Sequence, residues 1–322
     1  TDMLVEDVHF RRAWSSPRDI GAKAIAVNVS DLSAMGAEPR LATLSLALPV
    51  DLALEDFDEL AAGAGEAARE AGLAIAGGNL TRSPGPLVVD VTAIGYVHAR
   101  KALERAGARP GDEVYVTGSI GAGAAGVAWL ERHGMPAESS AAGPAVRRAC
   151  RPRVTGRAGV ALSRAGASRA AIDLSDGLAD GLRRLAEASG AGMTIEASAL
   201  PIDAAARWIF GELGLDPVQA SLAGGDDYEL LFTVPARARG RFRAARAHLG
   251  TTATRIGVVT AGGRLQVDGA GSFDVASLGF DHFGRRWLEL PTFPPVRLVD
   301  GGTIPREDYE RRIPRQPPRD PE

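Results

Sequence analysis

The chain has 322 residues, of which 45% are hydrophobic and 24% charged, and its formal net charge is −3. This composition is typical of a globular protein that buries a full core, and the length predicts two domains. Because the charge is slightly negative and no basic patch precedes the C-terminal tail, we expect no nucleic-acid partner.

The expected compartment follows from cysteine and hydropathy. Cys150 is the only cysteine, so no internal disulfide forms. No segment resembles a signal-peptide core or contains about 18 uninterrupted apolar residues. We therefore expect a cytoplasmic protein that does not bind a membrane.

The first hundred residues mix helix and strand signals. Residues 23–37 predict a helix, and residues 41–49 predict a strand rich in Leu. The acidic start and Ala-rich body of residues 54–73 predict a second helix. Residues 87–97 predict another strand, with partial alternation of apolar positions. These elements indicate an α+β domain over residues 1–107.

A Pro-Gly turn after Gly107 marks the predicted domain boundary. Beyond it, strands and helices alternate, which predicts an α/β domain over residues 108–283 and an α/β fold class for the chain. We expect strands at 113–117, 168–173, 228–235 and 254–262, and helices opening near 121, over 177–190 and from 236. The Pro- and Arg-rich residues 284–322 predict a disordered tail.

Carboxylates recur where apolar runs end. Asp173, Ser175 and Asp176 lie in "AAIDLSDGLAD", and Asp31 and Asp226 lie in "AVNVSDLSAMGA" and "LAGGDDYELLF". One such residue could simply be a helix N-cap, which stabilises a helix by about 1 kcal/mol. The Gly-Gly-Asp-Asp segment would also suit a tight turn. If several carboxylates meet, each close pair repels by about 4 kcal/mol at an effective dielectric of 20, so they protonate or bind cations. Oxygen ligands without a His or Cys cluster suit Mg²⁺ together with phosphates.

Two familiar nucleotide motifs do not explain this pattern. The chain has no G-x-x-x-x-G-K-[ST] segment, which excludes a P-loop enzyme. Gly121, Gly123 and Gly126 form a dinucleotide-type G-x-G-x-x-G after a predicted strand. The second strand with an acidic end that NAD(P) binding requires is missing downstream, so close packing of a helix on the sheet is the better interpretation.

The motifs taken together resemble a known family. "TDMLVEDVHF", "KAIAVNVSDLSAMGAEPR", "AGGNLTRS", "LERAGARPGDEVYVTGSIG", "AAIDLSDGLADGL", "GGDDYELLFTV" and "GFDHF" follow one another as in thiamine-monophosphate kinases. That family belongs to the superfamily of aminoimidazole ribonucleotide synthetase and selenophosphate synthetase. The resemblance covers residues 1–283. It implies an aminoimidazole ribonucleotide synthetase-like fold and a homodimer formed through N-terminal sheets.

The resemblance also implies an activity, namely direct in-line transfer of the γ-phosphoryl group of ATP to thiamine monophosphate, assisted by several Mg²⁺ ions. The metal ligands it implies are Thr1, Asp2, Asp31, Asn79, Asp173 and Asp176. The implied nucleotide contacts are Gly78, Asn79, Arg105 and Ser175. The implied substrate contacts are His9, Asp226 and Phe280. Among these residues, Asp31, Asp176 and Arg105 are expected to be catalytic.

Three departures from the family pattern stand out. The Gly-Asp-Asp segment that precedes the Thr-Asp pair in the family is absent from this sequence, and we expect that an N-terminal piece is missing. Asn79 stands where many members have aspartate, and Asp226 replaces the more usual glutamate. The alternatives are another ATP-using enzyme of the same superfamily, or a truncated, inactive dimeric scaffold or binding protein.

Overall fold

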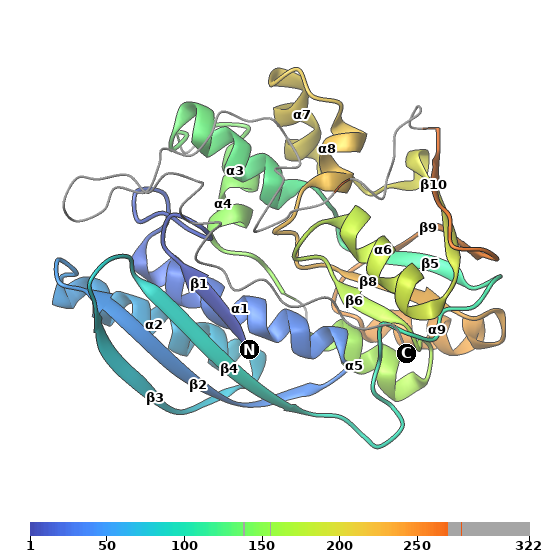
Figure 1. Cartoon of the computed structure of the whole chain (residues 1–322), viewed down its shortest axis with the longest axis horizontal. Coiled ribbons are helices and arrows are strands. Elements are labelled where there is room, and N and C mark those ends of the chain that lie inside the picture. Colours follow the sequence, from blue (N-terminus) through green and yellow to red (C-terminus); the bar gives the residue numbers. More distant parts are fainter. Residues whose placement is uncertain (138, 155, 270–277, 279–322) are drawn as a thin grey trace, which may run out of the picture. The chain divides into compact units, whose positions relative to one another are not determined.

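The computed structural model describes residues 1–137, 139–154, 156–269 and 278. These residues form two β-sheets, one from the first hundred residues and one from the remainder, with helices packed on them (Figure 1). All of them belong to one compact unit of the chain.

The first sheet has four strands in the order β1-β4-β2-β3. Its strands are β1 (Asp2–Val5), β2 (Glu38–Pro49), β3 (Ala74–Ser83) and β4 (Val88–Tyr96). Strand β4 pairs antiparallel with β1 and β2, whereas β3 pairs parallel with β2 at the sheet edge. The helices α1 (Pro17–Ala34) and α2 (Leu54–Ala71) bury their apolar residues against Leu46, Val89 and Val91.

The second sheet has six strands in the order β10-β7-β9-β5-β8-β6. Its strands are β5 (Glu113–Thr117), β6 (Ala171–Asp173), β7 (Gly192–Glu196), β8 (Leu230–Val234), β9 (Ala253–Thr260) and β10 (Leu265–Asp268). Every neighbouring pair is antiparallel except β10 with β7.

The later helices surround this second sheet and its connections. They are α3 (Ala122–His133), α4 (Gly143–Cys150), α5 (Gly156–Ala165), α6 (Leu178–Ser189), α7 (Ala204–Glu212), α8 (Pro217–Ala223) and α9 (Arg239–Ala245). Short 3₁₀ turns lie at η1 (Ala197–Ala199), η2 (Ala236–Ala238) and η3 (Arg246–His248). Leu178, Leu182 and Leu185 of α6 are fully buried, as their spacing on one helical face requires.

Helix α1 begins with a well-formed N-cap. The Ser16 hydroxyl accepts a hydrogen bond from the Asp19 backbone N–H, and Pro17 occupies the first helical turn, where its missing N–H is not needed. At the other end Gly36 has φ of 67°, which glycine adopts without strain. Residues near the end of α1, Ser30 and Asp31 among them, are thus carried on a helix with defined limits.

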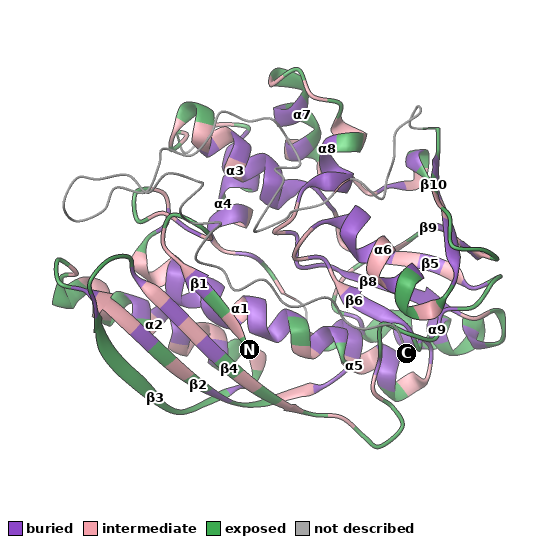
Figure 2. Cartoon of the chain, viewed as in Figure 1, coloured by how far each residue is buried: buried purple, intermediate pink, exposed green. Residues whose placement is uncertain are grey.

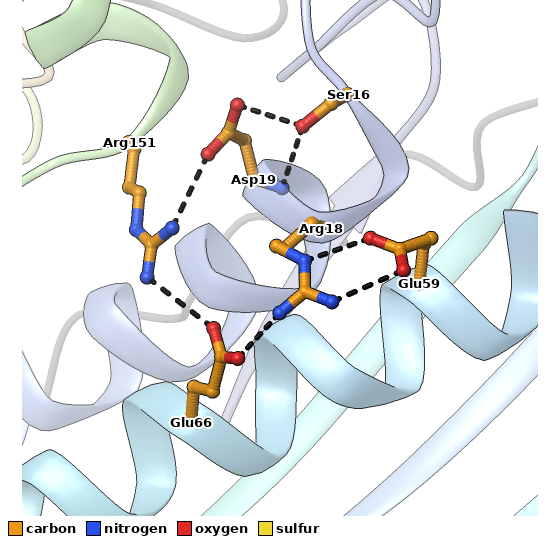
Figure 3. A network of polar contacts seen from close by, with 6 residues as sticks. All are labelled: Ser16, Arg18, Asp19, Glu59, Glu66 and Arg151. Atoms are coloured by element: carbon orange, nitrogen blue, oxygen red, sulfur yellow. Dashed lines mark hydrogen bonds and ion pairs between the residues drawn. The ribbon is translucent and has the colours of Figure 1, made fainter.

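An ion-pair network joins α1, α2 and the end of α4 (Figure 3). Arg18 of α1 donates to both oxygens of Glu59 at 2.7 and 3.0 Å and also pairs with Glu66 of α2. Arg151, directly after α4, lies 3.5 Å from Asp19 and 4.0 Å from Glu66. Such partly exposed pairs contribute little each. Together they hold the end of α4 beside the first turns of α1.

The structure confirms the mixed class of fold and most of the predicted elements. The strand at 113–117 is found with the predicted limits, and α2, α6, β4, β8 and β9 begin and end within three residues of their predicted limits. Helix α1 begins at Pro17 rather than at residue 23, and the strand predicted from residue 168 has ladder pairing only from Ala171. The structure also contains elements that the sequence reading did not specify, among them the edge strand β3. No helix in the described part of the chain is long and apolar enough to cross a bilayer.

Candidate active site

Two acidic segments that lie 50 residues apart in the sequence run side by side in the structure. They are residues 173–177 (DLSDG), after β6, and residues 224–229 (GGDDYE), before β8. The Asp226 N–H donates to the Ser175 carbonyl at 2.8 Å, and the Tyr228 N–H donates to the Leu174 carbonyl at 2.9 Å. Since Gly177 has φ of 99° and a Cβ there would lie 2.8 Å from the Gly224 oxygen, only glycine fits this approach.

Four aspartates from three different elements converge near these loops. The Ser30 hydroxyl of α1 donates to Asp173 Oδ2 at 2.6 Å and so ties α1 to the end of β6. Burial, then repulsion from Asp31 and Asp176, raises the pKa of Asp173 to about 7. Burial, then repulsion from Asp31, also raises the pKa of Asp2, and Asp176 adds to this repulsion. Groups that shift one another's pKa in this way share one electrostatic environment.

Arg105 lies beside this cluster. Asp31 is exposed, yet surrounding protein atoms exclude enough water from its carboxylate to raise its pKa. Arg105 opposes that shift through its positive charge. The guanidinium comes from the connection between the two sheets, so a cation from that connection lies within electrostatic reach of Asp31.

The aspartate cluster fits a hard cation in charge and in ligand chemistry. Repelling, partly buried carboxylates are stabilised by a divalent cation, and carboxylate oxygen is the ligand that Mg²⁺ prefers. Within the described residues, no three His, Cys, Asp or Glu side chains are grouped closely enough to hold one metal ion by themselves. Mg²⁺ is often bound by only one or two carboxylates, and phosphate and water oxygens supply its other ligands. Such a site does not require three protein ligands around one ion.

A second group of residues surrounds Asp226. Its Oδ1 accepts a hydrogen bond from the Tyr228 hydroxyl at 2.9 Å, and its Oδ2 lies 3.1 Å from Lys23 Nζ. Asp226 and Tyr228 have φ of 64° and 51°, a region that few residues other than glycine adopt. The Tyr228 ring packs into the core of the first sheet. His9 Nδ1 accepts from the Val5 N–H at 3.0 Å, which leaves Nε2 as the protonated nitrogen of a neutral ring.

The remaining predicted site residues have different surroundings. Thr1 donates to the Val91 carbonyl at 3.1 Å at the start of β1. Gly78 and Asn79 lie on the edge strand β3, in register with Leu44 and Ser45, and are separated from β1 by β2 and β4. A Cβ at Gly78 would overlap the Leu44 carbonyl oxygen. Asn79 is exposed there, and its predicted role as a metal ligand stays a prediction. Phe280 lies outside the described residues.

The structure explains why the G-x-G-x-x-G segment is not a dinucleotide site. The N–H groups of Gly121 and Gly123, at the start of α3, donate to the two oxygens of Asp227 at 2.7 and 3.3 Å. Asp227 is completely buried, and this burial raises its pKa to about 8. The place where a pyrophosphate would bind in a dinucleotide fold therefore holds a side chain of the protein itself.

Sequence reasoning missed three polar residues that organise the site, namely Ser30, Lys23 and Tyr228. Ser30 precedes the predicted ligand Asp31 in "NVSD", and Tyr228 follows the Asp-Asp pair, so both residues lie inside motifs that the sequence analysis identifies. The sequence does contain one indication for Lys23. Lys23 and Lys101 are the only lysines in a chain with 37 Lys and Arg, so a lysine stands out where arginine is the usual cation.

Family models match both halves of the chain. The model described as AIR synthase related protein, N-terminal domain, matches residues 1–97, and the one described as AIR synthase related protein, C-terminal domain, matches residues 109–269. Together they span both sheets and every residue of the aspartate cluster.

Individual relatives are similar over most of their length. The chain is 40% identical over 288 residues to the thiamine-monophosphate kinase of Escherichia coli K12, covering 88% of this chain and 85% of that protein. Among solved structures, the thiamine-monophosphate kinase from Stenotrophomonas maltophilia superimposes with a TM-score of 0.77 at 34% identity, covering 84% of each chain. A structure of AaThiL complexed with AMPPCP and TMP has a TM-score of 0.78 at 32% identity, covering 88% of this chain and 85% of that one.

Proposed function

Since the chain belongs to the thiamine-monophosphate kinases, we propose that it transfers the γ-phosphoryl group of ATP to thiamine monophosphate and forms thiamine diphosphate. The observation that carries this proposal is the hydrogen bond from Ser30, the neighbour of Asp31 on α1, to Asp173 at the end of β6, which brings carboxylates from distant parts of the chain near one another. Asp31 and Asp176 both raise the pKa of Asp173, in agreement with this arrangement. The similarity to a structure with AMPPCP, an ATP analogue, and TMP supports the same pair of substrates.

We assign the aspartate cluster, with Thr1 and Asn79, to Mg²⁺ binding. When bound there, Mg²⁺ would neutralise the negative charge of the ATP phosphates. The protein's own part is to hold these carboxylates in place before substrate arrives, which Ser30 does for Asp173 through its hydrogen bond. We assign Arg105 to the transferred phosphoryl group, where a positive charge would stabilise the transition state.

The acceptor needs no strong base from the protein. Its phosphate oxygen is already ionised at neutral pH, so positioning and charge neutralisation account for most of the expected acceleration. We assign the nucleotide to Arg105 and Ser175. Gly78 and Asn79, on the far edge of the first sheet, are proposed as nucleotide contacts on the family resemblance alone. We assign the acceptor to the side of His9 and Asp226, together with Phe280 of the C-terminal region.

A direct assay tests the proposed function. Protein made from its complete gene is incubated with ATP, Mg²⁺ and thiamine monophosphate, and thiamine diphosphate is measured by chromatography. We expect formation of thiamine diphosphate with thiamine monophosphate as acceptor and none with thiamine, because thiamine offers a hydroxyl instead of an ionised phosphate oxygen. If the protein phosphorylated the substrate of another enzyme of the superfamily and did not phosphorylate thiamine monophosphate, the chain would have that other activity instead.

We further propose that the first sheet forms a homodimer through the face opposite α1 and α2. Leu41 of β2 and Ile94 of β4 are direct partners in the register and are 44% and 55% exposed, and Met3 and Tyr96 are also exposed apolar residues of β1 and β4. Figure 2 shows exposed and half-buried residues along the strands of this sheet and a largely buried helix α1. A second copy of the chain would bury this face, because the same apolar surface of two copies can pack together around a two-fold axis.

A charge placed on this face tests the dimer. We expect Ile94→Lys to convert the dimer into a monomer in sedimentation velocity, because a lysine would have to be desolvated at the interface. Val50→Lys is the matched control, since Val50 is 77% exposed in the turn that follows β2. A wild-type protein that sediments as a monomer would contradict the proposed dimer. If Ile94→Lys still sediments as a dimer, the interface lies on another surface.

A further inference from the structure

Lys23 of α1 is a buried cation that joins three separate segments of the chain. Only 3% of its side chain is exposed. Its Nζ donates to the His9 carbonyl at 3.0 Å, to the Ala149 carbonyl at 3.2 Å and to Asp226 Oδ2 at 3.1 Å. These acceptors lie after β1, at the end of α4 and before β8.

The geometry uses every hydrogen of the ammonium group. Lysine has three N–H donors and no acceptor, and here each donor has one protein partner. Burying an ammonium ion without partners costs several kcal/mol, which the charge of Asp226 and the two carbonyl oxygens offset. A planar guanidinium does not direct three donors to three convergent acceptors, which explains a lysine here in a chain whose cations are almost all arginine.

The Lys23 contact completes a tight restraint on Asp226. The backbone of Asp226 is held by its N–H to the Ser175 carbonyl, at a positive φ of 64°. One carboxylate oxygen is held by the Tyr228 hydroxyl and the other by Lys23. The side chain is nevertheless 31% exposed, so the restrained carboxylate still reaches the surface of the site.

We propose that Lys23 is a positioning residue for the acceptor substrate, because it fixes the Asp226 carboxylate. This inference rests on the proposed function, which assigns Asp226 and His9 to thiamine monophosphate. Lys23 itself does not touch the substrate. The Ala149 contact anchors the ammonium to α4, whose end is held by the Arg151 pairs of Figure 3. Through Lys23, Asp226 is therefore linked to the end of α4.

Steady-state kinetics of Lys23→Gln test the role. Glutamine retains hydrogen-bond donors but lacks the charge, and its shorter side chain cannot reach all three acceptors. We expect the KM for thiamine monophosphate to rise by about tenfold or more, as the loss of a hydrogen bond to a charged group predicts. We expect the KM for ATP to stay within about twofold, because the aspartate cluster and Arg105 are not contacted by Lys23. Lys101→Gln is the matched control, since Lys101 Nζ makes an exposed contact with the Arg164 carbonyl at 3.1 Å.

A double-mutant cycle separates positioning from general stabilisation. If Lys23 acts through Asp226, then Lys23→Gln combined with Asp226→Asn raises the KM for thiamine monophosphate no more than Asp226→Asn alone, within about twofold. Additive effects, or equal increases in both KM values, would overturn the positioning role. A Lys23→Gln protein that does not fold would also overturn it in favour of a structural one. Absence of thiamine diphosphate formation by the wild-type protein would instead overturn the proposed function.

Discussion

Asp31→Asn and Asp176→Asn, each introduced in protein made from its complete gene, are expected to lower kcat by about 100- to 1,000-fold while the fold stays intact. Enzymes lose rate on this scale when one group that stabilises transition-state charge is removed. Both carboxylates raise the pKa of Asp173, so both lie within electrostatic reach of the same site. An amide keeps the size of the side chain and removes the charge that the Mg²⁺ ions require.

The stability of the same variants provides the control. Because the cluster carboxylates repel one another without a cation, Asp31→Asn should leave the melting temperature in Mg²⁺-free buffer unchanged or slightly higher. Asp176→Asn also loses a partly exposed ion pair with Arg184 at 3.6 Å, and such a pair contributes little, so its melting temperature should change only slightly. Asp58→Asn on the exposed face of α2 is the matched substitution that should affect neither kcat nor stability. Near-normal kcat in Asp31→Asn or Asp176→Asn would contradict the proposal that the cluster acts in phosphoryl transfer.

Three members of the aspartate cluster, Asp31, Asp173 and Asp176, could be predicted from sequence because they lie where apolar runs end, whereas Asp2 came from the family resemblance. Asp173 follows a strand and Asp31 lies near the end of a helix, and such positions bring side chains to one edge of a fold. The apolar pattern alone does not distinguish Asp226 from its neighbour Asp227, and only the family resemblance singles out Asp226. The first is half-exposed beside Lys23, whereas the second is buried under α3 on the Gly121 and Gly123 N–H groups. Adjacent side chains diverge here because the backbone at Asp226 has a positive φ, which no periodicity reveals.

The fold was predictable where the hydrophobic pattern is strong. Buried strands such as β8, and the amphipathic helix α6, have clear apolar periods and were predicted. Strand β3 was not, because AIAGGNLTRS has two adjacent glycines and no alternation. All but its last residue are exposed, so its position depends on ladder pairing with β2 and not on burial. The domain limits at 107 and 283, the disordered tail and the cytoplasmic location stay predictions.

The geometry of the site depends on how closely α1 packs on α2. Gly21 of α1 faces the backbone of α2 at Leu60, and Gly63 of α2 faces the backbone of α1 at Arg18. At either glycine, a Cβ would overlap a carbonyl oxygen of the partner helix. Backbone atoms inside two helices cannot rotate away as a side chain does. This crossing therefore sets the position of α1, and with it the positions of Lys23 and Asp31.

We expect Gly63→Ala to lower the free energy of unfolding by about 3 kcal/mol, the upper part of the range for overpacked cores, because the helices must separate to admit the methyl group. Gly65, two residues further along α2, provides the opposite control, since a Cβ there meets nothing within 4 Å. Gly65→Ala should raise the free energy of unfolding by about 0.5–1 kcal/mol through the lower backbone entropy of the unfolded chain. Urea unfolding followed by circular dichroism measures both variants. If they changed stability in the same direction, the helix crossing would not be the close backbone contact described above.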